Sequence, residues 1–421
     1  MFVSLKSCNF AVLNLVDMKG RLTEIAPLMP LAVGLMTGIV VGRYVALPVS
    51  WWYLLIGGVV LALLSWRMAH VQTVAIEVCF VLLGASMAER QHWEQDFHTT
   101  KGEVYSEETS RLERSKMFFL QKRDQLLQRL SDGGMEGDAY AVVAAMALGD
   151  KSALTKDLKD TYSVTGASHV LALSGLHLGI IYMLLSLVVG RRWRMVSQLL
   201  VILSIWAFVF LVGMSVSVVR SAIMLSVYAL LSLGHRRRMS VNTLAFTAMI
   251  MLVINPKSLF DVGFQMSFMA VLSILLWMPI FGRMFTEQYL MDHRVVKWLW
   301  GLLSVSCAAQ MGVAPLVAFY FGRFSSYFLL TNLIVIPAAT LILYLALVVL
   351  VAPSLAYLLI YIVNGLNVVL ARMAELPGAS IDGLHPTMLQ VIMVYVIIFS
   401  FWLIIERTLP AREWKPSRVR W

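Results

Sequence analysis

Seven residues carry the groups that could contact a charged ligand inside otherwise apolar sequence. They are His169, Ser174, Gly175, His177, Arg220, Asp261 and Gln265. An ionisable side chain within a membrane-spanning helix costs about 2.5–3.5 kcal/mol on insertion scales, so it usually pairs with a polar group or lines a polar path. A packing ion pair between Arg220 and Asp261, or interhelical hydrogen bonds of the histidines, would explain the same residues, and their types alone do not separate these interpretations.

The spacing of these residues argues against metal and nucleophile chemistry. His169 and His177 are about 12 Å apart along a straight helix, too far to share a metal ion, so we expect no metal and no cofactor. Ser174 and His177 have no orienting acid beside them, which disfavours an intramembrane hydrolase. GlyAspLysSer at 149–152 is not a phosphate-binding loop, and the HisGluxxHis motif of zinc proteases is absent. The sequence predicts that the chain is not an enzyme by itself.

The composition places these residues in a polytopic membrane protein. The chain has 421 residues, of which 59% are hydrophobic and 14% are charged. Such a composition is typical of membrane-embedded chains. The formal net charge of +10 fits either nucleic-acid binding or basic cytoplasmic loops, and three cysteines cannot build a disulfide framework.

Apolar stretches predict the helices that cross the membrane. We expect an all-α fold with about 10–12 spans, each of roughly 20 residues, plus amphipathic interfacial helices. The predicted spans lie near 26–46, 51–66, 71–88, 169–189, 195–212, 214–233, 241–255, 262–281, 297–317, 327–351, 354–371 and 387–405.

The segment before the fourth span is amphipathic. In residues 155–165 the charged side chains lie opposite Leu158, as in a helix on a membrane surface. Ser168 offers an N-cap hydroxyl. The sequence therefore predicts a span over 169–189 whose first free N–H groups would favour an anion. Within it, the small pair Ser174–Gly175 permits close helix approach or a kink.

Lysine and arginine lie mostly on one side of the predicted membrane. With a cytoplasmic N-terminus and twelve crossings, the cytoplasmic loops hold most basic residues, including those of 191–194 and 236–238. The polar segment 89–168 is then extracytoplasmic. The polar residues of the fourth, sixth and eighth spans fall on that same side, with His177 deeper. We infer an outer vestibule that leads into a polar path between these three spans.

The chain divides into four regions on this basis. They are N-terminal transmembrane hairpins (1–88), a short extracytoplasmic polar segment (89–134), a transmembrane core (135–405) and a basic cytoplasmic tail (406–421).

Four blocks of sequence resemble the membrane core of the ComEC-type competence channel family, which takes up DNA in transformable bacteria. They are LeuGlyAspLys at 148–151, GlyAlaSerHisValLeuAlaLeuSerGlyLeuHis at 166–177, SerValSerValValArgSerAlaIleMet at 215–224 and AspValGlyPheGlnMetSerPheMetAla at 261–270. Their order and spacing match, and the resemblance covers roughly residues 135–350. It implies a bacterial inner-membrane channel that passes one DNA strand into the cytoplasm, with the seven residues named first along its path.

The resemblance also implies a compact member of the family. Long members carry an outer OB-type nucleic-acid-binding domain and a metallo-β-lactamase-like domain, which we do not find here. A separate helicase or motor and a separate nuclease are then expected as partners, and a homodimer is one arrangement of the pore. The alternative function is a proton-coupled secondary transporter for a small anion, with His169, His177 and Asp261 as a relay.

Overall fold

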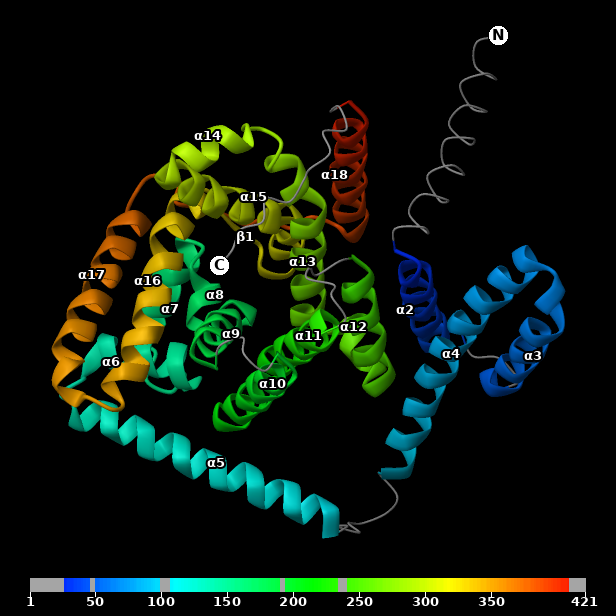
Figure 1. Cartoon of the computed structure of the whole chain (residues 1–421), viewed down its shortest axis with the longest axis horizontal. Coiled ribbons are helices and arrows are strands. Elements are labelled where there is room, and N and C mark those ends of the chain that lie inside the picture. Colours follow the sequence, from blue (N-terminus) through cyan, green and yellow to red (C-terminus); the bar gives the residue numbers. More distant parts are fainter. Residues whose placement is uncertain (1–25, 46–49, 99–106, 190–193, 234–240, 409–421) are drawn as a thin grey trace. The chain divides into compact units, whose positions relative to one another are not determined.

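The computed structural model describes residues 26–45, 50–98, 107–189, 194–233 and 241–408 (Figure 1). A helix occupies every one of the twelve predicted ranges. Among these described residues, six helical segments are long and apolar enough to cross a membrane, and the other apolar helices are shorter. The six are His70–Glu89, Val262–Phe281, Arg294–Phe321, Phe328–Val349, Pro353–Ala374 and Met388–Thr408. The predicted fold class, an all-α polytopic membrane protein, is therefore confirmed.

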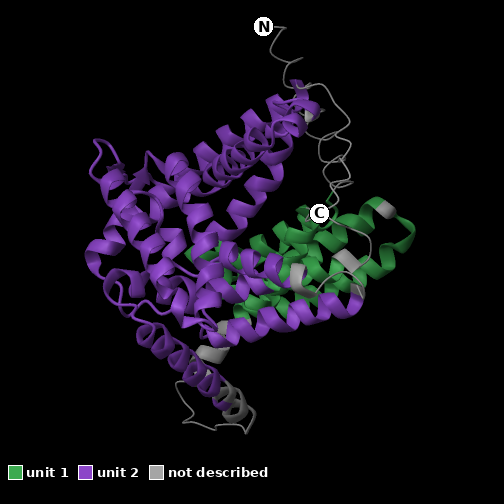
Figure 2. Ribbon diagram, turned by 60° about the vertical axis from the view of Figure 1, so that its left-hand side comes forward, with its two compact units in different colours: residues 1–113, 223–265 green, residues 114–222, 266–421 purple. Residues whose placement is uncertain are grey.

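The chain forms two compact units that do not follow its linear order (Figure 2). Unit 1 comprises residues 1–113 and 223–265, and unit 2 comprises residues 114–222 and 266–421. Three continuous helices, α5 (Glu107–Asp132), α11 (Val216–Leu233) and α13 (Val262–Phe281), begin in one unit and end in the other. Each unit is described below by itself.

Glycines bring the helices of unit 1 into close contact. Its elements are α2 (Leu28–Tyr44), α3 (Trp51–Leu64), a 3-10 turn (Ser65–Arg67), α4 (Ala69–His98), α12 (Val241–Ile254) and a second 3-10 turn (Pro256–Phe260). A Cβ at Gly38 of α2 would overlap the backbone of Val81 in α4, and one at Gly84 of α4 would overlap Leu35. Backbones that approach this closely are typical of membrane helix pairs.

Unit 2 combines long helices with short, broken ones. Its elements before α11 are α5 (Glu107–Asp132), α6 (Gly137–Val143), a π-helical turn (Ala144–Leu148), α7 (Lys156–Val164), α8 (Ser168–Leu171), α9 (Gly175–Val189) and α10 (Arg194–Leu211). Those after α13 are α14 (Glu287–Asp292), α15 (Arg294–Phe321), β1 (Arg323–Ser325), α16 (Phe328–Val349), a 3-10 turn (Pro353–Leu355), α17 (Ala356–Ala374), β2 (Ser380–Asp382) and α18 (Met388–Thr408). The antiparallel pair β1–β2 was not expected from the sequence.

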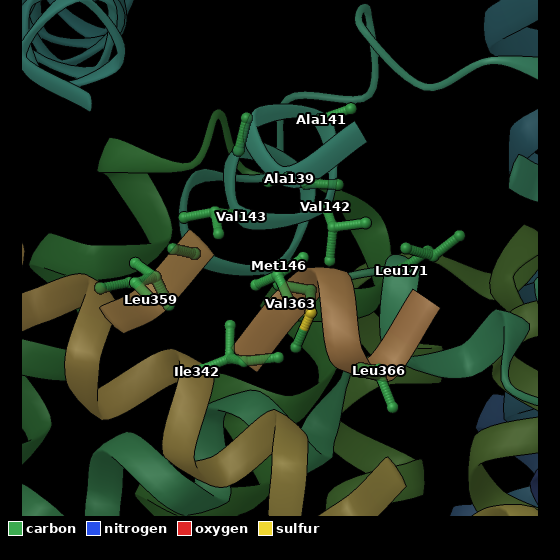
Figure 3. Close-up of a cluster of buried hydrophobic side chains, with 14 of the residues drawn as sticks. Ala139, Ala141, Val142, Val143, Met146, Leu171, Ile342, Leu359, Val363 and Leu366 are labelled. Atoms are coloured by element: carbon green, nitrogen blue, oxygen red, sulfur yellow. The ribbon is translucent and has the colours of Figure 1, made fainter. Parts of the chain in front are cut away.

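The core of unit 2 forms around α6 and the π-helical turn. Figure 3 shows Val142, Val143 and Met146 among apolar side chains of α16 and α17, and all three are fully buried. A Cβ added to Gly133 would lie 3.6 Å from the Cβ of Ala356, at the start of α17. Tyr162 of α7 forms a hydrogen bond with Asn367, further along that helix. Residues 133–162 thus run along 11 residues, or about 17 Å, of α17. The burial of the apolar run from Ala139 in this core was not expected for a part of the polar segment 89–168, whose position outside the membrane stays a prediction.

Candidate functional site

The predicted span over 169–189 is interrupted at Ala172–Ser174, at the Ser174–Gly175 pair where the sequence permits a kink. The one-turn α8 ends at Leu171, Ala172 is extended with φ −93° and ψ 127°, and α9 begins at Gly175. Ser168 makes no capping hydrogen bond, and the cap position of α8 is Ala167. His169 therefore lies in α8 and His177 in α9.

Ser174 and His177 form the N-terminal cap of α9. The Ser174 backbone N–H donates to His177 Nδ1 at 3.4 Å, and the Ser174 Oγ lies 3.2 Å from the same nitrogen. This resembles a capping box, in which the third helical side chain accepts a hydrogen bond from the N-cap backbone. His177 is 1% exposed. A neutral imidazole that accepts at Nδ1 carries its proton on Nε2, which makes no hydrogen bond of good geometry among the described residues.

The break also places the two histidines in different helices. His169 is exposed, and its Nδ1 lies 3.1 Å from the carbonyl of Gly166. In a straight helix the two histidines would lie on one element, about 12 Å apart.

The N-terminus of α9 contacts α11 beside Arg220. A Cβ at Gly175 would lie 3.0 Å from Ser221 Oγ, so glycine permits the approach. Arg220, the residue before Ser221, is 4% exposed and takes part in polar interactions. The predicted neighbourhood of the fourth and sixth spans is confirmed at this contact. Five of the seven predicted residues thus lie in unit 2, four of them on α8, α9 and α11 and Ser174 directly before α9.

Asp261 and Gln265 lie in unit 1, where both hold the start of α13. Asp261 Oδ1 accepts a hydrogen bond from the Phe264 N–H at 2.8 Å, as an N-cap does. Gln265 Nε2 donates to the carbonyl of Leu259 at 3.0 Å. The sequence analysis missed this capping role, although an aspartate just before an apolar helix is a recognised start signal. The pairing of Asp261 with Arg220 stays a prediction.

Arg323 of β1 is a polar centre that the sequence analysis missed. Its Nε lies 2.6 Å from Asp382 Oδ1 in β2, and its Nη1 lies 2.9 Å from Asp160 Oδ1 in α7 and 3.3 Å from Ser163 Oγ. The hydrogen bond with Asp160 is the main cause that raises the pKa of Arg323. The only sequence signal was an arginine in a short loop between two predicted spans.

Two ion-pair groups fit the predicted alternation of crossings in unit 2. Asp160, Arg323 and Asp382 all belong to segments predicted on the outer side. Arg283 and Glu406 pair at 3.1 Å, and both belong to segments predicted on the cytoplasmic side. Neither ion-pair group joins segments predicted on opposite sides.

Fold and site together define a polytopic, all-helical membrane protein with buried polar groups where broken helices meet. Within the described residues, no group of three metal-ligating side chains is positioned to hold an ion. The model of the family described as "Competence protein" matches residues 146–408, so the chain belongs to the competence protein family. The matched region contains all seven predicted residues and Arg323. The resemblance seen in the four sequence blocks is thereby confirmed.

Two relatives are similar over about half of this chain. "ComE operon protein 3" of Bacillus subtilis (strain 168) is 31% identical over 208 residues, which are 48% of this chain and 25% of the relative. An "Uncharacterized protein" of Aquifex aeolicus (strain VF5) is 32% identical over 197 residues, 47% of this chain and 44% of the relative. No solved structure matches. The chain spans less than half the length of each of these relatives.

Proposed function

We propose that this protein is a channel in the bacterial inner membrane that passes single-stranded DNA into the cytoplasm during natural transformation. The observation that carries the proposal is the family match over 146–408, because it covers every polar residue of the candidate path. This match favours DNA uptake over the proton-coupled transport of a small anion. In this proposal the chain is not an enzyme.

The chemistry of the candidate path suits a moving polyanion. A phosphate backbone in a low-dielectric interior needs donors and positive charge, yet it must leave each contact easily. Arg220 supplies one charge, and the neutral groups around the start of α9 supply weaker contacts. The free N–H groups of the first helical turn add a partial positive charge.

The proposal implies partners. We infer that a separate helicase or motor drives the strand and that a separate nuclease removes its complement, because no nucleotide-binding loop is found in the sequence. A pore formed by two copies is compatible with the proposal.

A strain that lacks the gene tests the function. Radiolabelled duplex DNA is offered to cells, and label on the surface is separated from label that has become nuclease-protected inside the cytoplasm. We expect normal surface binding, no internal label and no transformants. The full-length gene should restore the internal label and the transformants. Normal transformation of the deletion strain would end the proposal.

A further inference from the structure

Four buried polar atoms gather under α7 in unit 2. Tyr162 of α7 donates to Asn367 Oδ1 of α17 at 2.8 Å, and Gly166, just after α7, packs against Ser325 and Phe328. Among the described residues, four buried atoms near these contacts have no hydrogen-bond partner: Ser325 Oγ, Thr331 Oγ1, Asn332 Oδ1 and Asn367 Nδ2.

Helical spacing places these atoms on one surface. Thr331 and Asn332 follow Phe328 by three and four residues, so they lie on the face of α16 that meets Gly166. One turn further, Val335 belongs to the same apolar cluster as Tyr162. The face of α16 that meets Gly166, directly after α7, is therefore polar near β1 and apolar one turn deeper.

An unpartnered polar atom in a dry interface costs free energy, and native structures usually give it water or a ligand. Four such atoms together indicate a surface that is made for polar contacts and is covered in this structure. Hydroxyl and amide groups are neutral, so they would form hydrogen bonds with a phosphate backbone or its water that are weak enough to be released.

The connections at both ends of α7 would allow this helix to move. Gly149 and Gly166 bracket the segment with φ of +73° and +82°, a conformation that glycine adopts without strain. The π-helical turn Ala144–Leu148 precedes it, and such turns often mark functional positions. Leu158 and Tyr162 are the buried contacts of α7 itself, while its charged side chains are exposed.

Arg323 ties this segment to the β1–β2 pair. Its Nη1 contacts Asp160 of α7, and its Nε contacts Asp382 of β2. Both carboxylates are more than half exposed, so water and salt weaken the pairs and allow them to break.

We propose that α7 is a hinged cover over the outer mouth of the polar path, that Arg323 latches it, and that Thr331 and Asn367 line the mouth when it opens. The identity of the passing strand rests on the proposed function. The proposed movement of α7 does not depend on that function.

Cysteine labelling tests the movement without any DNA. In the full-length protein with its native cysteines replaced by alanine, Thr331→Cys is exposed to a membrane-impermeant maleimide added outside intact cells. Thr331 is fully buried, so its labelling rate follows the population in which α7 has moved. We expect Arg323→Gln to raise that rate roughly tenfold, equal to about 1.4 kcal/mol in the opening equilibrium.

Arg372→Gln is the matched control, because it breaks an exposed arginine–glutamate pair on α17 that does not involve α7. It should leave the labelling rate of Thr331→Cys unchanged. If Thr331→Cys stays unlabelled with Arg323→Gln, or is labelled equally with Arg372→Gln, the cover does not exist.

Uptake tests the lining. Thr331→Val removes the unpartnered hydroxyl but keeps the shape, and we expect internalised DNA to fall roughly tenfold at an unchanged amount of protein. Thr340→Val makes the same change on the same helix, where the hydroxyl already donates to Ile336, and should have no effect. Normal uptake with Thr331→Val would overturn the lining while leaving the labelling result and the deletion phenotype intact.

Discussion

At the residue scale, the candidate path is built from side chains that also hold the structure. His177 completes the cap of α9 through Nδ1 and keeps Nε2 in the interior. Asp261 caps α13 through one carboxylate oxygen. Alanine substitutions at such positions would mix a loss of folding with a loss of function, so substitutions that keep the cap are more informative.

Asp261→Asn separates the charge from the cap. Asparagine caps helices as well as aspartate does, so the amount of protein in the membrane should stay normal. If the negative charge serves the path, uptake of DNA should fall roughly tenfold, measured as nuclease-protected label per cell.

Asp261→Ala is the comparison, because it removes both the charge and the cap. It should also lower thermal stability in detergent, by about 1 kcal/mol. Uptake that remains normal in the asparagine variant would show that Asp261 is only a cap.

At the element scale, the sequence predicted helices well and their breaks poorly. Apolar stretches located all twelve helical ranges, because a bilayer demands long apolar runs. The Ser174–Gly175 pair permitted a kink, but a complete break between Leu171 and Gly175 could not be predicted, because hydropathy does not distinguish a straight helix from an interrupted one.

The deep position of Ala139–Leu148 escaped prediction for a related reason. The run is too short for a span, and its burial depends on contacts with α16 and α17, which are far away in sequence. Arg323 was missed as a centre because its partners Asp160 and Asp382 are brought to it only by the fold.

The α2–α4 pair gives a test of helix contact. Gly38→Ala would push a Cβ into the backbone of α4, and backbone cannot move aside cheaply, so the variant should unfold at a lower temperature in detergent. Gly57→Ala on α3 is the control, since its Cβ would meet nothing within 4 Å. There alanine should be neutral or stabilising, by up to about 1 kcal/mol. Equal melting temperatures for both variants would contradict the close packing.

At the scale of the whole molecule, the seven predicted residues belong to two different units. The histidines, the Ser174–Gly175 pair and Arg220 belong to unit 2, while Asp261 and Gln265 belong to unit 1. The sequence placed all seven on one side of the membrane through alternating crossings. In unit 2 the pairs Arg323–Asp160 and Arg283–Glu406 agree with that alternation. The family match spans the second part of unit 1 and most of unit 2.

The central claim is that a DNA strand passes along the polar groups of the core, and cross-linking during uptake tests it most directly. A photoreactive amino acid replaces either His169, exposed on α8, or Ile397, 66% exposed on α18. Labelled DNA with a bulky protein on one end is arrested in transit, and the cells are irradiated. The account predicts a covalent DNA adduct from position 169 and none from position 397. Arrested DNA that gives no adduct at 169, or equal adducts at both positions, would contradict it.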